Sequence, residues 1–296
     1  MRYRLLGPLQ VVDGEVPVDV GPRKQRAVLA ALLLAQGRVV SADRLIDAVW
    51  GDDVPASATT SLQVYISNLR RALRGESQMA SPIVRQPPGY YLDVASDDVD
   101  VSVFAASCAR AAAAIDGERW DEALREADAA LGLVRGNLLE DMGDVDWLRE
   151  DAARLTEMRT ECLANKVISL LALGKSAEAV TEVSRLRELE PLADRGCRLH
   201  MLALYQAGRA AEALDAYTRH ARMLDDELGL EPGAELRGLQ TAVLRQAPEL
   251  AGWPRSPEWT GAGALPEPDP VPPPAMAVEA TAHRAALVGR DRELAR

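Results

Sequence analysis

Large apolar residues recur at a helical spacing in the stretch ATTSLQVYISNLRRALR, which runs from residue 58 to residue 74. These residues are Leu62, Ile66, Leu69 and Leu73. At about 100° per residue they lie on one side of a helix. The stretch therefore predicts a helix with one buried stripe. Its opposite side holds no acid and consists of Thr60, Val64, Ser67, Asn68 and Arg71, flanked by Ser61, Gln63, Arg70 and Arg74.

This acid-free side is typical of a helix that reads DNA. An exposed helix usually mixes Glu and Lys in pairs four residues apart. Amide side chains instead bond adenine edges, guanidinium groups bond guanine or phosphate, and Val or Thr methyl groups contact thymine. The alternative is an ordinary amphipathic helix whose arginines extend into water. The neighbouring segments decide between these interpretations.

Those segments predict a sheet, two more helices and a hairpin. Residues 2–20 form short β-type runs broken by Gly-Pro and Asp-Gly pairs, which predicts an antiparallel sheet. One helix is predicted from Pro22 to Gly37, and a second from its cap residue Ser41 to Gly51. The residues expected to point inward from these helices are Val28, Leu29, Leu32, Leu33, Leu45, Ile46, Val49 and Trp50. Residues 83–94 predict a β-hairpin around a Pro-Pro-Gly turn.

This order is typical of a winged helix, whose third helix enters the major groove and whose hairpin touches the DNA backbone or minor groove. Arg23, Lys24 and Arg26 crowd the start of the first helix, although positive charge opposes the helix dipole there. A phosphate bound by these side chains and the free N–H groups would explain them, and a solvated basic surface is the alternative. Asp52 and Asp53 are expected to point away from DNA, toward a basic protein or water.

Charge is divided unevenly along the chain. Residues 1–94 carry 11 Lys and Arg against 9 Asp and Glu, whereas the remaining 202 residues carry 23 against 36. Only the N-terminal part can therefore approach a polyanion without repulsion. The acidic remainder is either a solvated surface or a face for a basic partner.

The cysteines and apolar runs limit the protein's class. Cys108, Cys162 and Cys197 lie in separate apolar runs and are expected to be reduced core residues. Cys197 and His200 would supply only half a zinc site, so no metal or other cofactor is expected. No signal peptide is recognisable, and the longest apolar run, residues 27–35, is half the length of a membrane span. We expect a soluble, cytoplasmic protein that does not contact membranes.

From residue 101 the sequence consists of long Ala, Leu, Arg and Glu segments that predict helices throughout. Gly117, Gly174 and Gly208 are each followed shortly by Glu-Ala and an aliphatic residue. The last two Glu-Ala pairs begin at residues 178 and 212, which is the spacing of tetratricopeptide helix pairs. We therefore expect three stacked helical hairpins and a closing helix after a turn at residues 230–233.

The run GPRKQRAVLAALLLAQGRVVSADRLIDAVWGDDVPASATTSLQVYISNLRRAL, closed by PPGYYL, resembles the OmpR-type winged helix of the Streptomyces antibiotic regulatory protein (SARP) family. The resemblance covers residues 1–94 and implies an α+β winged helix followed by an all-α, tetratricopeptide-like bacterial transcriptional activation domain. The expected divisions are residues 1–96, residues 97–247, a proline-rich disordered linker at 248–285, and residues 286–296. The last of these resembles the start of an ATPase domain in larger family members, so we expect a piece of a longer protein that binds no nucleotide.

The resemblance implies roles for individual residues. Those expected to read bases are Thr60, Ser61, Val64, Ser67, Asn68 and Arg71. Those expected to hold the DNA backbone are Arg23, Lys24, Arg26, Tyr65, Arg70, Arg74, Arg85 and Tyr90. The hairpin departs from the family, which often has basic residues where Gln86 and Tyr91 stand here. Asp52 and Asp53 are a hypothesis for a contact with RNA polymerase.

The resemblance also implies a function. Such proteins activate secondary-metabolite (antibiotic) gene clusters, bind promoter direct repeats near the −35 element as head-to-tail homodimers, and recruit RNA polymerase through sigma region 4 and the alpha C-terminal domain. A nucleoid-associated location follows. The alternative is a signalling scaffold in which both domains bind proteins. An enzyme is not expected, because no phosphate loop and no nucleophile near a histidine is apparent.

Overall fold

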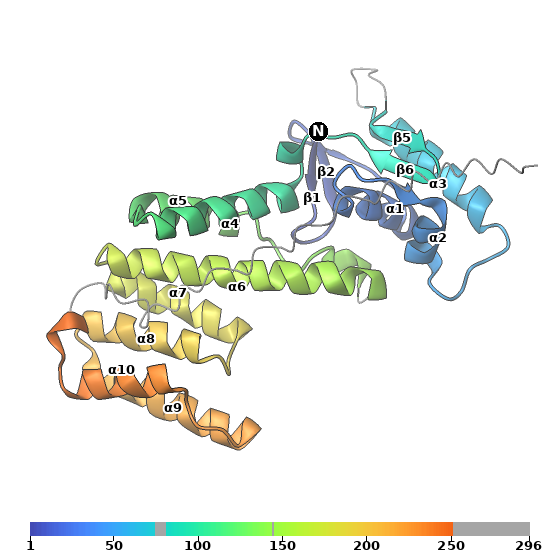
Figure 1. The fold of residues 1–296 in the computed structure, drawn as a ribbon. Coiled ribbons are helices and arrows are strands. Elements are labelled where there is room, and N and C mark those ends of the chain that lie inside the picture. The colour runs from blue at the N-terminus through green and yellow to red at the C-terminus, as the bar shows by residue number, and fades with distance from the viewer. Residues whose placement is uncertain (75–80, 144, 251–296) are drawn as a thin grey trace, which may run out of the picture. The chain divides into compact units, whose positions relative to one another are not determined.

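The computed structural model describes residues 1–74, 81–143 and 145–250 (Figure 1). Contacts join these residues into one compact unit. The expected linker from residue 251 and the ATPase-like end lie outside the described residues. The described part confirms the fold class, which is an α+β winged helix followed by an all-α region.

The chain begins with the antiparallel sheet that its alternating sequence predicts. Strands β1 (Arg2–Arg4), β2 (Gln10–Asp13) and β3 (Val16–Val18) pair in that order. The turn between β2 and β3 uses Gly14 at a φ of +61°, a conformation that glycine adopts without strain. This sheet lies on the side of the winged helix next to the helical region (Figure 1).

Three helices and a second sheet complete the winged helix. The helices are α1 (Arg23–Leu34), α2 (Ala42–Trp50) and α3 (Ala58–Ala72), and the strands are β4 (Val40–Ser41), β5 (Ile83–Gln86) and β6 (Gly89–Leu92). The predicted β5–β6 hairpin is confirmed, and β6 also pairs with β4, which the sequence analysis did not anticipate. A Cβ atom at Gly89 would lie 1.8 Å from the Val40 carbonyl oxygen, so only glycine permits this pairing.

The predicted stripes form the core of the winged helix. The four predicted stripe residues Leu62, Ile66, Leu69 and Leu73 and the four inward residues of α1 are all at most 3% exposed. The side chain of Ser41 caps α2 by accepting a bond from the Arg44 N–H at 3.2 Å. The expectation for α2 was partly wrong, because Leu45 is buried whereas Ile46, Val49 and Trp50 are only half-buried.

The helical region contains the three predicted hairpins and the closing helix. Its helices are α4 (Asp100–Asp116), α5 (Trp120–Leu131), α6 (Arg149–Ala172), α7 (Ser176–Leu189), α8 (Asp194–Gln206), α9 (Ala210–Leu228) and α10 (Ala234–Leu244). Four short 3₁₀ turns lie at Ser96–Asp98, Glu140–Met142, Asp146–Leu148 and Pro248–Leu250. Helices α4 with α5, α6 with α7, and α8 with α9 pack as pairs (Figure 1). The alanines of the repeated Glu-Ala pairs, Ala123, Ala179 and Ala213, are fully buried and allow close helix packing.

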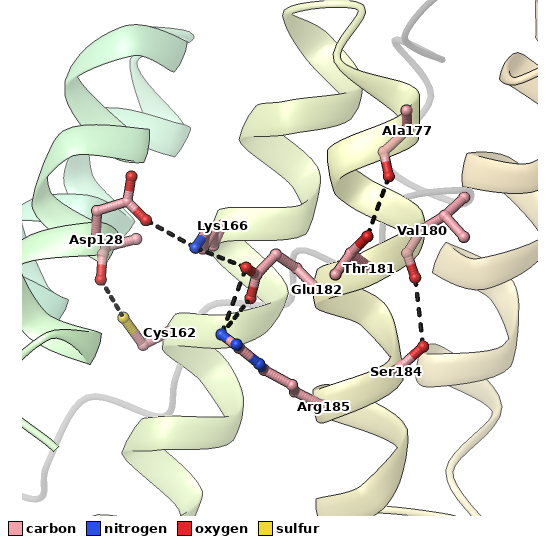
Figure 2. Close-up of polar contacts among 10 residues, drawn as sticks. Asp128, Cys162, Lys166, Ala177, Val180, Thr181, Glu182, Ser184 and Arg185 are labelled. Carbon is pink, nitrogen blue, oxygen red and sulfur yellow. Dashed lines mark hydrogen bonds and ion pairs between the residues drawn. The ribbon is translucent and has the colours of Figure 1, made fainter. Parts of the chain in front are cut away.

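A polar cluster links α5, α6 and α7 (Figure 2). The Lys166 Nζ atom on α6 lies 2.8 Å from Asp128 on α5 and 3.1 Å from Glu182 on α7. Glu182 also pairs with Arg185 at 3.2 Å. Although burial opposes it, bonding to these two carboxylates raises the pKa of Lys166. One cation therefore ties the first hairpin to the second.

The winged helix and the helical region share backbone hydrogen bonds as well as an apolar core. The Asp100 carboxylate at the start of α4 accepts bonds from the N–H groups of Leu5, at 2.7 and 2.8 Å, and Leu6, at 3.0 Å. The Leu139 N–H donates to the Leu5 carbonyl oxygen at 2.9 Å, and the Arg135 N–H to that of Leu6 at 2.8 Å. The segment after β1 is thus held by the helical region.

We predict that His200 makes the stability of the helical region depend on pH. Burial, with Arg187, Arg219 and Arg209 nearby, lowers the pKa of His200 to about 4. An unfolded chain takes up this proton near pH 6.5, so the folded state loses stability as pH falls from about 7 toward about 4. Since the ring is half-buried, solvent screening should limit the effect to about 1 kcal/mol between pH 7 and 5. Urea unfolding of the wild type and of His200→Gln over this pH range measures the effect. Plots of the unfolding free energy against pH that run parallel for the two proteins would contradict the prediction.

Candidate nucleic-acid interface

Helix α3 packs on the winged helix through its apolar stripe and leaves its other side accessible. Val64 is 51% exposed although it is a large apolar residue. The six residues predicted to read bases all retain exposure, because Thr60, Val64, Ser67 and Arg71 are exposed and Ser61 and Asn68 are half-buried. The geometry is therefore compatible with groove insertion, and base reading by these residues stays a prediction.

A groove of about 590 Å³ runs between α3 and the β5–β6 hairpin. Its lining residues are Gln63, Ile66, Ser67, Arg70, Arg71, Arg74, Arg85 and Tyr90. Among these described residues four are arginines and none is acidic, so their lining is strongly positive at neutral pH. Such a groove attracts phosphate groups, whereas the acidic surfaces that dominate the rest of the chain repel them.

Arg70 is fixed at the floor of this groove. Its Nε atom donates to the Ile83 carbonyl oxygen at 3.0 Å, and its guanidinium group lies over the Tyr90 ring at 5.9 Å. The Tyr90 side chain is only 9% exposed. The ring therefore supports the Arg70 side chain, and a DNA-backbone contact by Tyr90, which also lines the groove, stays a prediction.

Tyr65 and Lys24 both contact Trp50, the last residue of α2. The rings of Tyr65 and Trp50 are stacked with centroids 6.1 Å apart, and the Lys24 Nζ atom lies 5.2 Å from the Trp50 centroid. Trp50 therefore links α1, α2 and α3 at the surface, and is not the core residue that was expected. The half-buried Tyr65 ring leans on it.

The basic start of α1 has a structural explanation that the sequence did not reveal. An Nη2 atom of Arg23 donates to the Met142 carbonyl oxygen. The Arg26 guanidinium group pairs with Asp141, its Nε lying 3.1 Å away, and donates to the Leu9 carbonyl oxygen at 2.7 Å. This corrects the reasoning that these two charges require a phosphate, because both arginines contact the helical region or its junction. DNA-backbone contacts by Arg23, Lys24 and Arg26 stay predictions.

The loop before α3 presents its two acids to the surface. Asp52 and Asp53 are both exposed. Asp52 also borders a cleft of about 540 Å³ that includes Trp50, Met142 and Trp147. The Nε1–H group of Trp147 is buried there and has no hydrogen-bond partner among the residues that the structure describes. The expectation that the acids are available to a protein partner is compatible with this position and stays untested.

Sequence reasoning missed one buried polar residue behind the interface, Gln25 of α1, which is 5% exposed. It contacts Asn68, whose amide oxygen in turn accepts a bond from Arg71 at 2.7 Å. A signal was available, because Gln25 lies three residues before Val28 and four before Leu29 and so belongs to the apolar stripe of α1.

The described residues hold neither a cluster of metal ligands nor a membrane-spanning helix. Across residues 1–74, 81–143 and 145–250, no three His, Cys, Asp or Glu side chains gather as metal ligands. His200 is instead bonded through Nδ1 to Arg187 at 3.1 Å. None of the helices in these ranges is long and apolar enough to cross a bilayer.

Two protein-family models match the chain in the order of its two regions. The family "Transcriptional regulatory protein, C terminal" matches residues 18–92. The family "Bacterial transcriptional activator domain" matches residues 99–244. The first match covers the helices and hairpin that form the groove, and the second covers α4 to α10.

Curated relatives share both regions. The transcriptional regulatory protein EmbR of Mycobacterium tuberculosis is 34% identical over 266 residues, which are 90% of this chain and 68% of EmbR. The regulatory protein DnrI of Streptomyces peucetius is 34% identical over 256 residues, covering 84% of this chain and 94% of DnrI. The regulatory protein AfsR of Streptomyces coelicolor is 36% identical over 256 residues, and this chain spans only 25% of its length.

A solved structure has the same fold. It is Mycobacterium tuberculosis EmbR in complex with a low-affinity phosphopeptide, which superimposes with a TM-score of 0.78 at 33% sequence identity. The match covers 83% of this chain and 65% of the EmbR chain. About a third of that solved chain therefore has no counterpart in the aligned part.

Proposed function

Because this chain belongs to the SARP family of transcriptional regulators, we propose that it is a sequence-specific activator that reads promoter bases with α3. The observation that carries the proposal is the groove beside α3, whose described lining residues include four arginines and no acid in a chain with a net charge of −11. The exposed hydroxyl, amide and valine side chains of α3 would read base edges, and the arginines would neutralise phosphates. Residues 1–96 would form the DNA-binding domain and residues 97–247 the activation domain.

The proposed promoter contacts follow the family pattern. Two copies would bind direct repeats near the −35 element as a head-to-tail homodimer. The activated genes would be a secondary-metabolite cluster, and the protein would act in the cytoplasm at the nucleoid. RNA polymerase would be recruited through sigma region 4 and the alpha C-terminal domain. In this proposal Asp52 and Asp53 supply one polymerase contact, since both are exposed beside α3 and phosphate repels them.

A signalling scaffold is the second candidate function. The relative EmbR was solved with a phosphopeptide, which supports protein recognition in that protein. The acidic helical region of this chain would offer a large surface to basic partners. The acid-free groove beside α3 has no role in this alternative, and we therefore rank it second.

Transcription in vitro tests the proposed function. The template carries a duplex that the wild-type chain selects from a random-sequence pool, placed as two direct repeats before a −35 element. Added wild-type chain is expected to raise the amount of transcript made by purified RNA polymerase at least about tenfold, which corresponds to one weak recruiting contact of about 1.4 kcal/mol. An unchanged transcript level despite bound protein would contradict activation and favour the scaffold.

Charge reversal tests the polymerase contact separately. Asp52→Lys with Asp53→Lys is expected to reduce activation about fivefold to tenfold, as expected when one exposed charged contact is lost. DNA affinity should stay the same or rise, because two acids that repel phosphate are removed from the loop before α3. Asp43→Lys, at an exposed acid near the start of α2, is the matched control. Full activation by the double variant would show that these aspartates do not contact the polymerase.

A further inference from the structure

A buried glutamine lies directly behind the proposed reading helix. Gln25 is 5% exposed, and its Nε2 atom donates to the Val20 carbonyl oxygen at 2.9 Å. Its Oε1 atom accepts a bond from the Asn68 Nδ2 atom at 3.2 Å. Both ends of this carboxamide are therefore bonded, as a buried polar group requires.

The backbone at Gly21 leaves room for this carboxamide. Gly21 has a φ of +83°, and a Cβ atom added there would lie 2.6 Å from the Gln25 Nε2 atom. Only glycine lets the amide pass this point to reach the Val20 carbonyl oxygen. Gln25 thus occupies a formed site between the turn before α1 and the inner edge of α3.

The contacts continue outward from the core to the groove. The Asn68 Oδ1 atom accepts a bond from Arg71 Nη2 at 2.7 Å. Asn68 is half-buried, whereas Arg71 is exposed and lines the groove. A single series of bonds therefore joins the Val20 carbonyl group to the guanidinium group of Arg71.

The donor-to-acceptor direction of these hydrogen bonds is determined at the inner end, by the Val20 carbonyl oxygen. A carbonyl oxygen only accepts hydrogen bonds, so the Val20 oxygen must face the nitrogen of the Gln25 amide. The Gln25 oxygen then faces Asn68, which must present its nitrogen inward and its oxygen outward. A guanidinium group only donates, and the outward oxygen is therefore the partner it needs.

We propose that Gln25 is a positioning residue for base recognition, because it orients Asn68 and thereby sets the direction in which Arg71 enters the DNA groove. The inference rests on the proposed function. It also changes the role of Asn68, whose nitrogen is directed to Gln25 and away from bases. Asn68 acts here as the support of Arg71, and adenine reading by Asn68 does not occur while the series is intact.

A double-mutant cycle on DNA specificity tests this role. The probes are the selected duplex and derivatives in which one base pair at a time is changed. Gln25→Met keeps the side chain's length and removes both bonds. We expect it to reduce discrimination about threefold to tenfold at the base pair whose recognition Arg71→Ala abolishes, and to leave other base pairs unaffected. In the Arg71→Ala background, Gln25→Met should cause no further loss. Gln10→Met, at an exposed glutamine of β2, is the control.

The outcomes separate this inference from the function on which it rests. If Arg71→Ala costs discrimination and Gln25→Met does not, or if the two losses multiply, the positioning role is overturned while DNA reading stands. If Arg71→Ala changes no base-pair preference, α3 does not read through Arg71 and the positioning role is overturned, while base reading by other residues of α3 stands. A uniform loss of affinity at every base pair would also overturn the positioning role, because it would reflect a general structural defect.

A second measurement covers the case in which Gln25→Met does not fold. In the wild-type chain, the side-chain amide protons of Asn68 should exchange with solvent at least about tenfold more slowly than those of the exposed Asn137. The shortened variant Gln25→Asn should remove this protection. Equal exchange of the two asparagines in the wild type would overturn the inference.

Discussion

Replacing Arg71 by alanine is expected to lower the preference for the selected duplex over a scrambled duplex by about 10-fold to 100-fold. A well-oriented arginine that bonds a guanine contributes about 1–3 kcal/mol of discrimination. Arg71 is exposed, lines the acid-free groove and is held by Asn68, which gives it the orientation that such a bond needs. Competition binding with both duplexes at one fixed salt concentration measures the preference.

The control for this prediction is Arg222→Ala, which removes an exposed arginine from α9. It deletes the same charge from the chain without touching the groove. We expect its preference to match the wild type. If Arg71→Ala weakens binding to both duplexes equally, Arg71 contacts phosphate only, and base reading must be assigned to other residues of α3.

Replacing Asp100 by alanine is expected to reduce the free energy of unfolding by about 3–5 kcal/mol. Asp100 is 8% exposed and accepts bonds from two backbone N–H groups of the segment after β1. Alanine would leave these buried donors without an acceptor, at about 1–3 kcal/mol each. Burial raises the pKa of Asp100, while bonds from Leu6 and Leu5 and the charge of Arg135 oppose this effect. Urea unfolding at pH 7 measures the loss.

Two further variants complete this test. Asp97→Ala removes an exposed acid three residues earlier and should cost less than about 0.5 kcal/mol. Asp100→Asn keeps one acceptor oxygen, and its loss of unfolding free energy should lie between those of Asp97→Ala and Asp100→Ala. A loss for Asp100→Ala as small as that of Asp97→Ala would mean that the bonds to Leu5 and Leu6 do not hold the two regions together.

Local periodicity predicted the elements that carry the interface. The stripe of α3 was predictable because four large residues at helical spacing must be buried together, and their burial determines which side of α3 remains accessible. The hairpin was predictable from its Pro-Pro-Gly turn, and the helical pairs from the repeated Glu-Ala spacing. Each of these signals lies within about 35 residues of sequence, where spacing alone determines which residues share a face.

Contacts between distant segments were not predictable in the same way. Arg26 pairs with Asp141, 115 residues later in the sequence, and Asp100 bonds Leu5, 95 residues earlier. The sequence suggested phosphate as the partner of Arg23 and Arg26, because positive charge opposes the helix dipole at the start of α1. Trp50 was expected in the core for its size, but its neighbours Lys24 and Tyr65 meet it at the surface. Residues far away in the sequence determine where these side chains lie and what they bond, and local periodicity does not reveal those residues.

A salt series on the wild-type chain tests whether α3 and its groove bind specific DNA. Affinity for the selected and the scrambled duplex is measured at several salt concentrations. We expect the selected duplex to bind at least about 1,000-fold more tightly, with a log–log salt slope that reflects several phosphate contacts at about 0.9 each. Equal and weak binding to both duplexes would contradict the account, and the scaffold function would then explain the protein better.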